Sequence, residues 1–136
     1  MIILIDTDIL IDLALDRAPF AEPAAALVDE LEKSPGTAFM AWHSVSNFYY
    51  LVSPARGRNQ TIGFLVDLAR FIEIAPTTTV SLHEAVKLDL KDFEDALQVA
   101  AALACHAGAI VTRNLKDYRR SPIQAVDPQA ALQFVS

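Results

Sequence analysis

The feature that most constrains the fold is a short apolar run near the start of the chain, Ile2–Ile5, which ends abruptly at Asp6. A continuous run rich in β-branched residues is typical of a strand buried on both faces, and such strands belong to parallel sheets covered by helices. Sheets of this kind bind ligands beyond the carboxyl ends of their strands. Asp6 is therefore the first candidate functional residue.

Further apolar runs alternate with helical patterns along the rest of the chain. Strands are predicted at Thr37–Trp42, Ile72–Ile74, Ala109–Thr112 and Gln124–Val126. Helices are predicted from about Ile9, at Ala21–Glu32, His43–Val52, Gln60–Phe71, Val80–Leu88 and Asp92–Ala107 (ended by Gly108), and from Pro128. This alternation predicts an α/β fold with a mostly parallel sheet. A length of 136 residues suits a single domain, residues 1–136.

The composition excludes several classes of protein. Apolar residues make up 53% of the chain, which is too many for a disordered protein. No apolar run approaches the ~20 residues of a membrane-spanning helix, and the start of the chain lacks the basic residues of a signal peptide. The single cysteine, Cys105, cannot form an internal disulfide. We therefore expect a cytoplasmic protein that makes no contact with a membrane.

The negative charge of the chain is concentrated at its start. The formal net charge is −6, and residues 1–33 account for all of it, while residues 34–136 are neutral on balance. A negative total argues against nucleic acid as a partner, because phosphate binders are usually basic. The densest basic run nevertheless follows directly after the predicted strand Ala109–Thr112. It is either a solvated loop or a phosphate clamp, formed by Arg113, Lys116, Arg119 and Arg120.

Three groups of polar residues are expected to meet at the carboxyl edge of the sheet. They are Asp6 with Asp8, Asn114 with Asp117, and Asp92 with Asp95. Neighbouring carboxylates repel one another unless a cation neutralises them, and Mg²⁺ binds one or two carboxylates together with waters and substrate phosphates. Such a cation activates water and stabilises charge on phosphoryl oxygens. Because the three histidines lack zinc-ligand spacing, the pattern favours metal-assisted hydrolysis of a phosphate ester.

Several of these acids also have a purely structural explanation. Asp8 and Asp92 suit helix N-caps, and stabilisation of the helix terminus is sufficient to account for Asp92 and Glu94. Asp95 lies on the less exposed side of the same helix and is the better functional candidate. Asp117 is equally well explained as a turn residue.

Taken together, these segments resemble the PIN-domain ribonucleases, the fold of VapC-type toxins. The resemblance rests on the strand that ends in Asp6-Thr-Asp8, on Asp-Phe-Glu-Asp95-Ala-Leu and on Thr112-Arg-Asn114-Leu-Lys-Asp117, in this order over nearly the whole chain. It implies a three-layer α/β/α fold, Mg²⁺ or Mn²⁺ held by acidic residues, and endonucleolytic cleavage of RNA. It also implies a homodimer and an antitoxin partner that plugs the active site.

The resemblance assigns roles to individual residues. Asp6 and Asp95 match the first and third family acids and are expected to bind the metal. Catalysis is assigned to Asp6, Asp95, Asn114 and Asp117, and a supporting or substrate-binding role to Asp8, Asn47, Asp92, Thr112 and Arg113. The second family acid, often a glutamate, is replaced by Asn47, and no acid occurs between Glu32 and Asp67. Because Asn47 carries no charge, weaker metal binding is expected.

Two alternatives remain open. The neutral Asn47 is compatible with a catalytically weak PIN-like module that binds RNA through its basic loop or acts only through a partner protein. Asp6-Thr-Asp8 and Thr112 also resemble marks of the haloacid dehalogenase phosphatases. The acidic pair that those enzymes need later in the chain is matched here only by the widely separated Asp117 and Asp127, so the phosphatase is the least favoured of the three.

Overall fold

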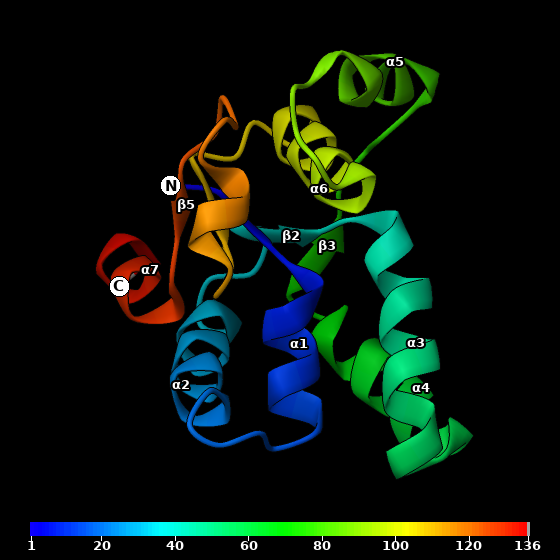
Figure 1. Ribbon diagram of the computed structural model, residues 1–136. Helices are drawn as coiled ribbons and strands as arrows, with labels where there is room; N and C mark the ends of the chain where they lie inside the picture. The colour runs from blue at the N-terminus through cyan, green and yellow to red at the C-terminus, as the bar shows by residue number, and fades with distance from the viewer. Residues whose placement is uncertain (136) are drawn as a thin grey trace.

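The structure is a computed structural model that describes residues 1–135, and it is built on a five-stranded sheet with helices on both faces (Figure 1). The strands are β1 (Ile3–Ile5), β2 (Ala38–Met40), β3 (Ile72–Ile74), β4 (Ala109–Val111) and β5 (Ala125–Val126). Their order in the sheet is β3-β2-β1-β4-β5, and every neighbouring pair is parallel. The predicted α/β fold with a parallel sheet is therefore confirmed.

Seven helices and one 3₁₀ turn accompany the strands within residues 1–135. They are α1 (Thr7–Ala14), α2 (Ala21–Glu32), α3 (Trp42–Arg56), α4 (Arg58–Leu68), α5 (Thr79–Lys87), α6 (Phe93–Ala104), η1 (Leu115–Tyr118) and α7 (Pro128–Val135). The helix predicted to begin near Ile9 starts two residues earlier, because Asp6 caps it. The strand predicted at Thr37–Trp42 is shorter, because α3 already begins at Trp42.

Side chains alternate between the two faces of the sheet, and the helices on each face form one layer on either side of it. In β1, Ile3 and Ile5 face a core shared with α1, α2, α3, α4 and α7, whereas Leu4 faces a second core formed with α6. Both faces of the strand are thus covered, which explains why its sequence is apolar without interruption. Helix α5 packs on α6, at the top of Figure 1.

Helix α6 ends earlier than the sequence pattern predicts. It stops at Ala104, and the residue in the left-handed conformation beyond it is His106, with φ 57°. The prediction that Gly108 ends this helix is therefore wrong. Gly108 instead donates its N–H to the carbonyl of Ile2, and a Cβ at this position would lie 2.8 Å from Cγ of Met1. The glycine thus permits close approach of the first residues to the start of β4.

The aromatic residues of α3 divide between the core and the surface. Phe48 is buried and stacks on Phe64 of α4, with the ring centroids 5.4 Å apart. Trp42 and Tyr50 are 67% and 72% exposed. Phe48 is therefore unable to stack on a base or to contact a second copy of the chain. No helix within residues 1–135 is long and apolar enough to span a bilayer.

Candidate active site

The candidate site lies where the chain reverses its direction across the sheet. From β1 the chain proceeds to β2 and β3 on one side, and it returns to β4 on the other side of β1. The carboxyl ends of β1 and β4 are therefore adjacent but open onto connections that diverge, which is where sheets of this type bind ligands. Asp6 directly follows β1, and Thr112 directly follows β4.

Asp6 is a buried carboxylate, and both of its oxygens accept hydrogen bonds. Its Oδ1 accepts from the backbone N–H of Thr7 at 2.7 Å, and its Oδ2 accepts from the hydroxyls of Thr112 at 3.0 Å and Tyr118 at 2.8 Å. Its exposed fraction is 6%. Burial, followed by the nearby charge of Asp8, raises the pKa of Asp6 to about 7. The protein holds this carboxylate in place although its charge is unfavourable there.

Asp8 ties the first turn of α1 to the segment after β4. Its Oδ2 accepts from the Thr112 hydroxyl at 3.2 Å, from the Arg113 N–H at 3.3 Å and from the Asn114 side-chain amide at 3.2 Å. Its other oxygen, Oδ1, is buried and has no hydrogen-bond partner among residues 1–135. Burial raises the pKa of Asp8 as well. One buried carboxylate oxygen of the site is thus free to accept a ligand.

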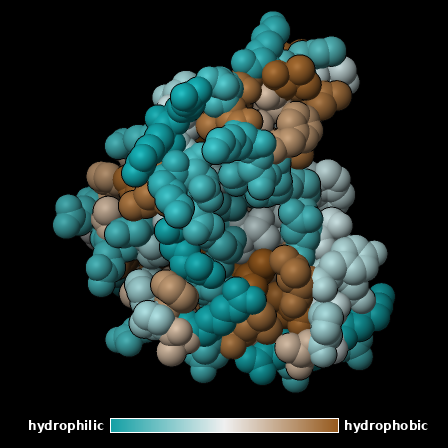
Figure 2. All heavy atoms as spheres, in the orientation of Figure 1, coloured by the Kyte–Doolittle hydropathy of each residue, from teal (hydrophilic) through white to brown (hydrophobic). Residues whose placement is uncertain are grey.

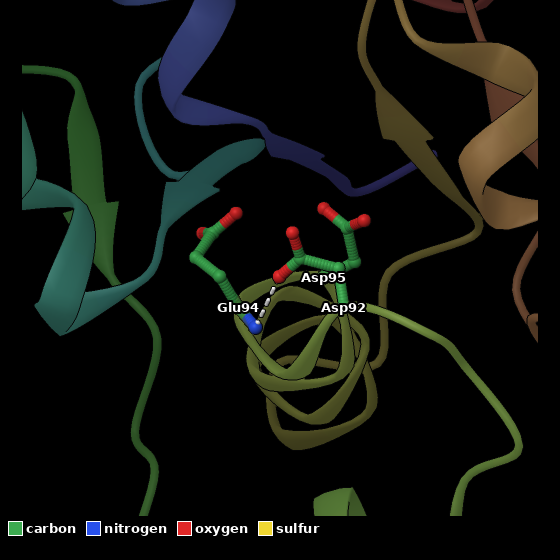
Figure 3. A group of neighbouring side chains, drawn as sticks. All are labelled: Asp92, Glu94 and Asp95. Carbon is green, nitrogen blue, oxygen red and sulfur yellow. Dashed lines mark hydrogen bonds between the residues drawn. The ribbon is translucent and has the colours of Figure 1, made fainter.

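The first turn of α6 contributes three acids. Asp92 caps the helix by accepting the N–H of Glu94 at 2.8 Å, and Figure 3 shows the side chains of Glu94 and Asp95 rising from this turn toward the strands. One carboxylate oxygen of each of the three lies within 4.8 Å of the others. Burial, followed by the charge of Asp92, raises the pKa of Asp95 to about 6. The turn therefore concentrates negative charge beside Asp6.

Tyr118 connects the two carboxylates that the sequence assigned to the metal. Its hydroxyl lies 2.8 Å from Oδ2 of Asp6 and 3.3 Å from Oδ1 of Asp95, and the residue is 3% exposed. A single phenol proton is thus shared between acids that lie on β1 and α6. Burial and the nearby acids raise the pKa of the phenol, so it stays a donor. Sequence reasoning missed Tyr118, because an aromatic residue after a polar turn suggests only core packing.

Sequence reasoning also missed Glu94 as a functional candidate, because stabilisation of the start of α6 was sufficient to explain an acid there. Its Oε2 lies 2.7 Å from Nε2 of His43 and accepts from the side-chain amide of Gln98 at 2.9 Å. These two partners lower the pKa of Glu94, although burial alone would raise it. Burial and the charge of Asp8 are the main causes of the raised pKa of Asp6, and the charge of Glu94 adds to them. The i, i+4 spacing of Glu94 and Gln98 is the one signal in the sequence that could have indicated this contact.

The other predicted residues occupy different parts of the site. Asn114 contacts Asp8, whereas Asp117 is exposed and acts on Asp95 through its charge, which contributes to the raised pKa of that residue. The guanidinium of Arg113 binds the buried Asp12 through Nε and Nη2, at 2.6 and 3.1 Å. The side chain of Asn47 is half-buried, and no hydrogen bond to this side chain is recorded among residues 1–135. The predicted roles of these residues in catalysis stay predictions.

A pocket of about 570 Å³ adjoins the acids of α6. It lies between the segment before α6 and the region around η1, and it is lined by Asp89, Leu90, Lys91, Asp92, Asp95, Lys116, Asp117, Arg119 and Arg120. Acidic and basic side chains thus share one opening, and Arg120 is paired with Asp89 across it. Figure 2 shows hydrophilic side chains over the middle of this face, with apolar ones gathered over α5 above and around α1 below.

The donor set fits a hard divalent cation. The side chains that converge are carboxylates, which are the ligands that Mg²⁺ and Mn²⁺ prefer. A buried carboxylate oxygen without a partner, Oδ1 of Asp8, is what a site prepared for an additional ligand presents. The raised pKa values of Asp6 and Asp95 record the repulsion and burial that a cation would offset. Among residues 1–135, the three acids whose oxygens lie within 4.8 Å of one another are Asp92, Glu94 and Asp95, and Asp6 is linked to Asp95 through the Tyr118 hydroxyl.

In the absence of metal, we expect the stability of the protein to fall as the pH rises from about 4 to about 7. The pKa of Asp6 is about 7 in the folded chain against an ordinary value of 3.8. Within this window the folded state keeps a proton that the unfolded state has released, so rising pH favours unfolding. Asp95, with a pKa of about 6, adds to this effect in the lower part of the window.

Urea unfolding in EDTA from pH 4 to pH 8 measures this dependence. Because other acids titrate in the same range, the relevant quantity is the difference between the wild type and the Asp6→Asn variant. We expect the wild type to lose stability relative to the variant up to about pH 7 and to change little above it. A difference that is constant with pH would show that Asp6 is ionised throughout, contrary to the buried environment seen here.

The strand order and the carboxylates at the point of chain reversal define an α/β protein with an acidic site. A family model described as the PIN domain matches residues 2–116. The chain therefore belongs to the PIN domain family. No curated protein sequence matches it. The family match gives no support to the phosphatase alternative.

Several solved structures share the fold of this chain. VapBC2 from Rickettsia felis, bound to a DNA fragment from its promoter, matches with a TM-score of 0.73 at 19% identity, covering 93% of this chain and 98% of that one. VapBC-1 from nontypeable Haemophilus influenzae matches with a TM-score of 0.69 at 17% identity, covering 95% of this chain and 99% of that one. VapC20 from Mycobacterium tuberculosis, a toxin that cleaves the sarcin–ricin loop, matches with a TM-score of 0.63 at 15% identity. The match covers 98% of this chain and 96% of that one. At these identities the likeness establishes the fold.

Proposed function

We propose that this protein is a metal-dependent endoribonuclease and the toxin of a toxin–antitoxin pair. The observation that carries the proposal is the pair Asp6 and Asp95, whose carboxylates share the Tyr118 hydroxyl at the point of chain reversal. Membership of the PIN domain family supports a nuclease. The carboxylate donor set supports a divalent cation, Mg²⁺ or Mn²⁺.

In this proposal the residues of the site divide the work. Asp6 and Asp95 hold the cation, which when bound activates a water molecule and stabilises charge on the phosphate. Thr112 and Tyr118 fix the orientation of Asp6 by donating to its Oδ2. Asp8 holds the segment after β4 through Asn114. Asn114 and Asp117 are proposed to act on the water or the leaving group at the open side of the site.

The pocket beside Asp95 supports RNA as the substrate in spite of the net charge of −6. Lys91, Lys116 and Arg119 line it, and among residues 1–135 none of the three is held in an ion pair. Cations that remain available next to a metal-binding carboxylate attract the phosphates that flank the scissile bond. The lining of the pocket thus supplies a local basic surface, although the net charge of the whole chain is negative.

The structural relatives also suggest partners. A toxin–antitoxin complex from Klebsiella pneumoniae matches 92% of this chain with a TM-score of 0.68 at 23% identity. We therefore propose an antitoxin that covers the active site. A homodimer is proposed on the resemblance alone. A single domain is proposed from the length of 136 residues, and a cytoplasmic location from the single cysteine, which cannot form an internal disulfide.

The proposal is tested by incubating the pure protein with total RNA and Mn²⁺ or Mg²⁺. We expect cleavage at defined sites that stops when EDTA is added and is lost in the Asp95→Asn variant. Cleavage that persists in EDTA or in this variant would contradict the proposed site. RNA binding that weakens with rising salt, without cleavage, would favour the catalytically weak binding module that the neutral Asn47 allows.

A further inference from the structure

Helix α3 borders the candidate site but brings no acid to it. His43, Ser44 and Asn47 share one face of this helix, because residues three and four apart are neighbours. Ser44 is fully buried and lies against α1 and α6, where its hydroxyl accepts from Thr7 and from the side-chain amide of Gln98. The face of α3 that contacts Thr7, Glu94 and Gln98 therefore carries an imidazole and a hydroxyl but no carboxylate, and Asn47 follows one turn later on the helix.

Glu94 approaches this face from the opposite side. It reaches the site from the first turn of α6, with its Oε2 held by His43 at 2.7 Å and by Gln98 at 2.9 Å. Both of these hydrogen bonds fall on this one oxygen, and the carboxylate also interacts with the side chain of Asp95. The carboxylate lies close enough to Asp95 for an oxygen of each to fall within 4.8 Å of the other.

Gln98 shows that the position of Glu94 is fixed by the core. Its side chain is fully buried, and its amide nitrogen lies 3.1 Å from Oγ1 of Thr7 and 3.0 Å from Oγ of Ser44 as well as 2.9 Å from Glu94. The amide is thus anchored on α1 and α3 while it donates to an acid on α6. An exposed glutamate that served only the helix terminus would need no such buried support.

We propose that Glu94, held by His43 and Gln98, is the third carboxylate of the metal site and supplies the negative charge that α3 lacks at Asn47. This inference rests on the proposed function, because it assumes that Asp6 and Asp95 bind a divalent cation. It differs from a simple ion pair between Glu94 and His43 in one respect. A structural pair contributes to folding, whereas a ligand contributes to the affinity of the folded protein for metal.

The test is the affinity of the full chain for Mn²⁺, measured by titration calorimetry without RNA. Glu94→Gln keeps an oxygen that accepts from His43 and Gln98 but removes the charge, and we expect binding to weaken by about tenfold or more. Glu22→Gln is the matched control, because Glu22 is an exposed acid in the first turn of α2. We expect the control to bind Mn²⁺ as the wild type does.

A second variant tests whether Glu94 takes the place of an acid on α3. Asn47→Glu, combined with Glu94→Gln, returns a carboxylate to the face that carries His43, and we expect it to recover most of the lost affinity. An affinity of Glu94→Gln equal to that of Glu22→Gln, with Asp95→Asn impaired, overturns the inference and leaves the proposed function intact. A wild-type chain that binds no Mn²⁺ overturns both. If the double variant binds Mn²⁺ no more tightly than Glu94→Gln does, the part of the inference that Glu94 takes the place of an acid at position 47 is overturned.

Discussion

The Asp6→Asn variant is expected to cleave RNA on the order of 10³-fold more slowly than the wild type while remaining folded. A metal held by one charge fewer stabilises the transition state less, and a loss of several kcal/mol corresponds to this factor. Asp6 is the acid most directly fixed by the sheet, since it follows β1 and its own N–H donates to the carbonyl of Val111. No neighbouring acid occupies the same position, so no other group replaces its charge.

The fold is expected to tolerate this change because both hydroxyls on Oδ2 have a second acceptor. Thr112 lies 3.2 Å from Asp8, and Tyr118 lies 3.3 Å from Asp95. With an amide nitrogen at position 6, each hydroxyl can rotate to its other partner. The loss of activity is therefore expected without unfolding.

Initial rates with Mn²⁺, together with circular dichroism, measure both parts of the prediction. Asp16→Asn serves as the control, because Asp16 is exposed and its positive φ of 53° suits asparagine equally well. We expect the control to cleave RNA at the wild-type rate. A folded Asp6→Asn variant with wild-type cleavage would place the active site elsewhere in the molecule.

The sequence was sufficient to predict the fold because the signals of the fold are local. Apolar runs such as Ile2–Ile5 identify strands buried on both faces, and the alternation with helices leaves few ways to arrange a parallel sheet. The end of α6 was predicted wrongly, since glycine is common after helices and Gly108 was near. The structure uses that glycine for its lack of a side chain against Met1, a contact between residues 107 positions apart.

The candidate site shows the same difference between local signals in the sequence and contacts between distant residues. Asp6, Asp8, Asp92 and Asp95 could be identified because each stands at the end of a strand or at the start of a helix. The partners of these acids could not be identified in this way. Tyr118 lies 112 residues from Asp6, and His43 lies 51 residues from Glu94. Such contacts depend on which side of a helix faces the sheet. The partner of a hydroxyl or an imidazole cannot be predicted from one sequence.

Arg113 illustrates the difference most clearly, because its sequence context allowed only a choice between a solvated loop and a phosphate clamp. The structure shows its guanidinium bound to Asp12 through two nitrogens and stacked 4.2 Å from the ring centre of Phe20. The side chain of Asp12 is 1% exposed. The arginine therefore anchors the segment after β4 to α1, and its backbone N–H is the part that reaches Asp8.

Replacing Arg113 by methionine is accordingly expected to destabilise the protein by about 3 kcal/mol, the lower end of the range for a broken buried pair, because Asp12 is buried but Arg113 is 30% exposed. Asp12 would be left with Arg17 alone, which lies at 3.5 Å and is itself 45% exposed. A contact of that kind is worth at most about 1 kcal/mol. Urea unfolding at pH 7.5 in EDTA measures the difference in the free energy of unfolding.

Two further variants separate the loss of the ion pair from the loss of packing against Phe20. Arg17→Met removes the weaker partner and is expected to change stability by no more than about 1 kcal/mol. Asp12→Leu combined with Arg113→Met removes the buried charge as well, and apolar replacement of a whole buried pair is often neutral or stabilising. We therefore expect the double variant to regain most of the stability that Arg113→Met loses. If it stays as unstable as the single variant, the contribution of Arg113 comes from its contact with Phe20 rather than from the charge of Asp12.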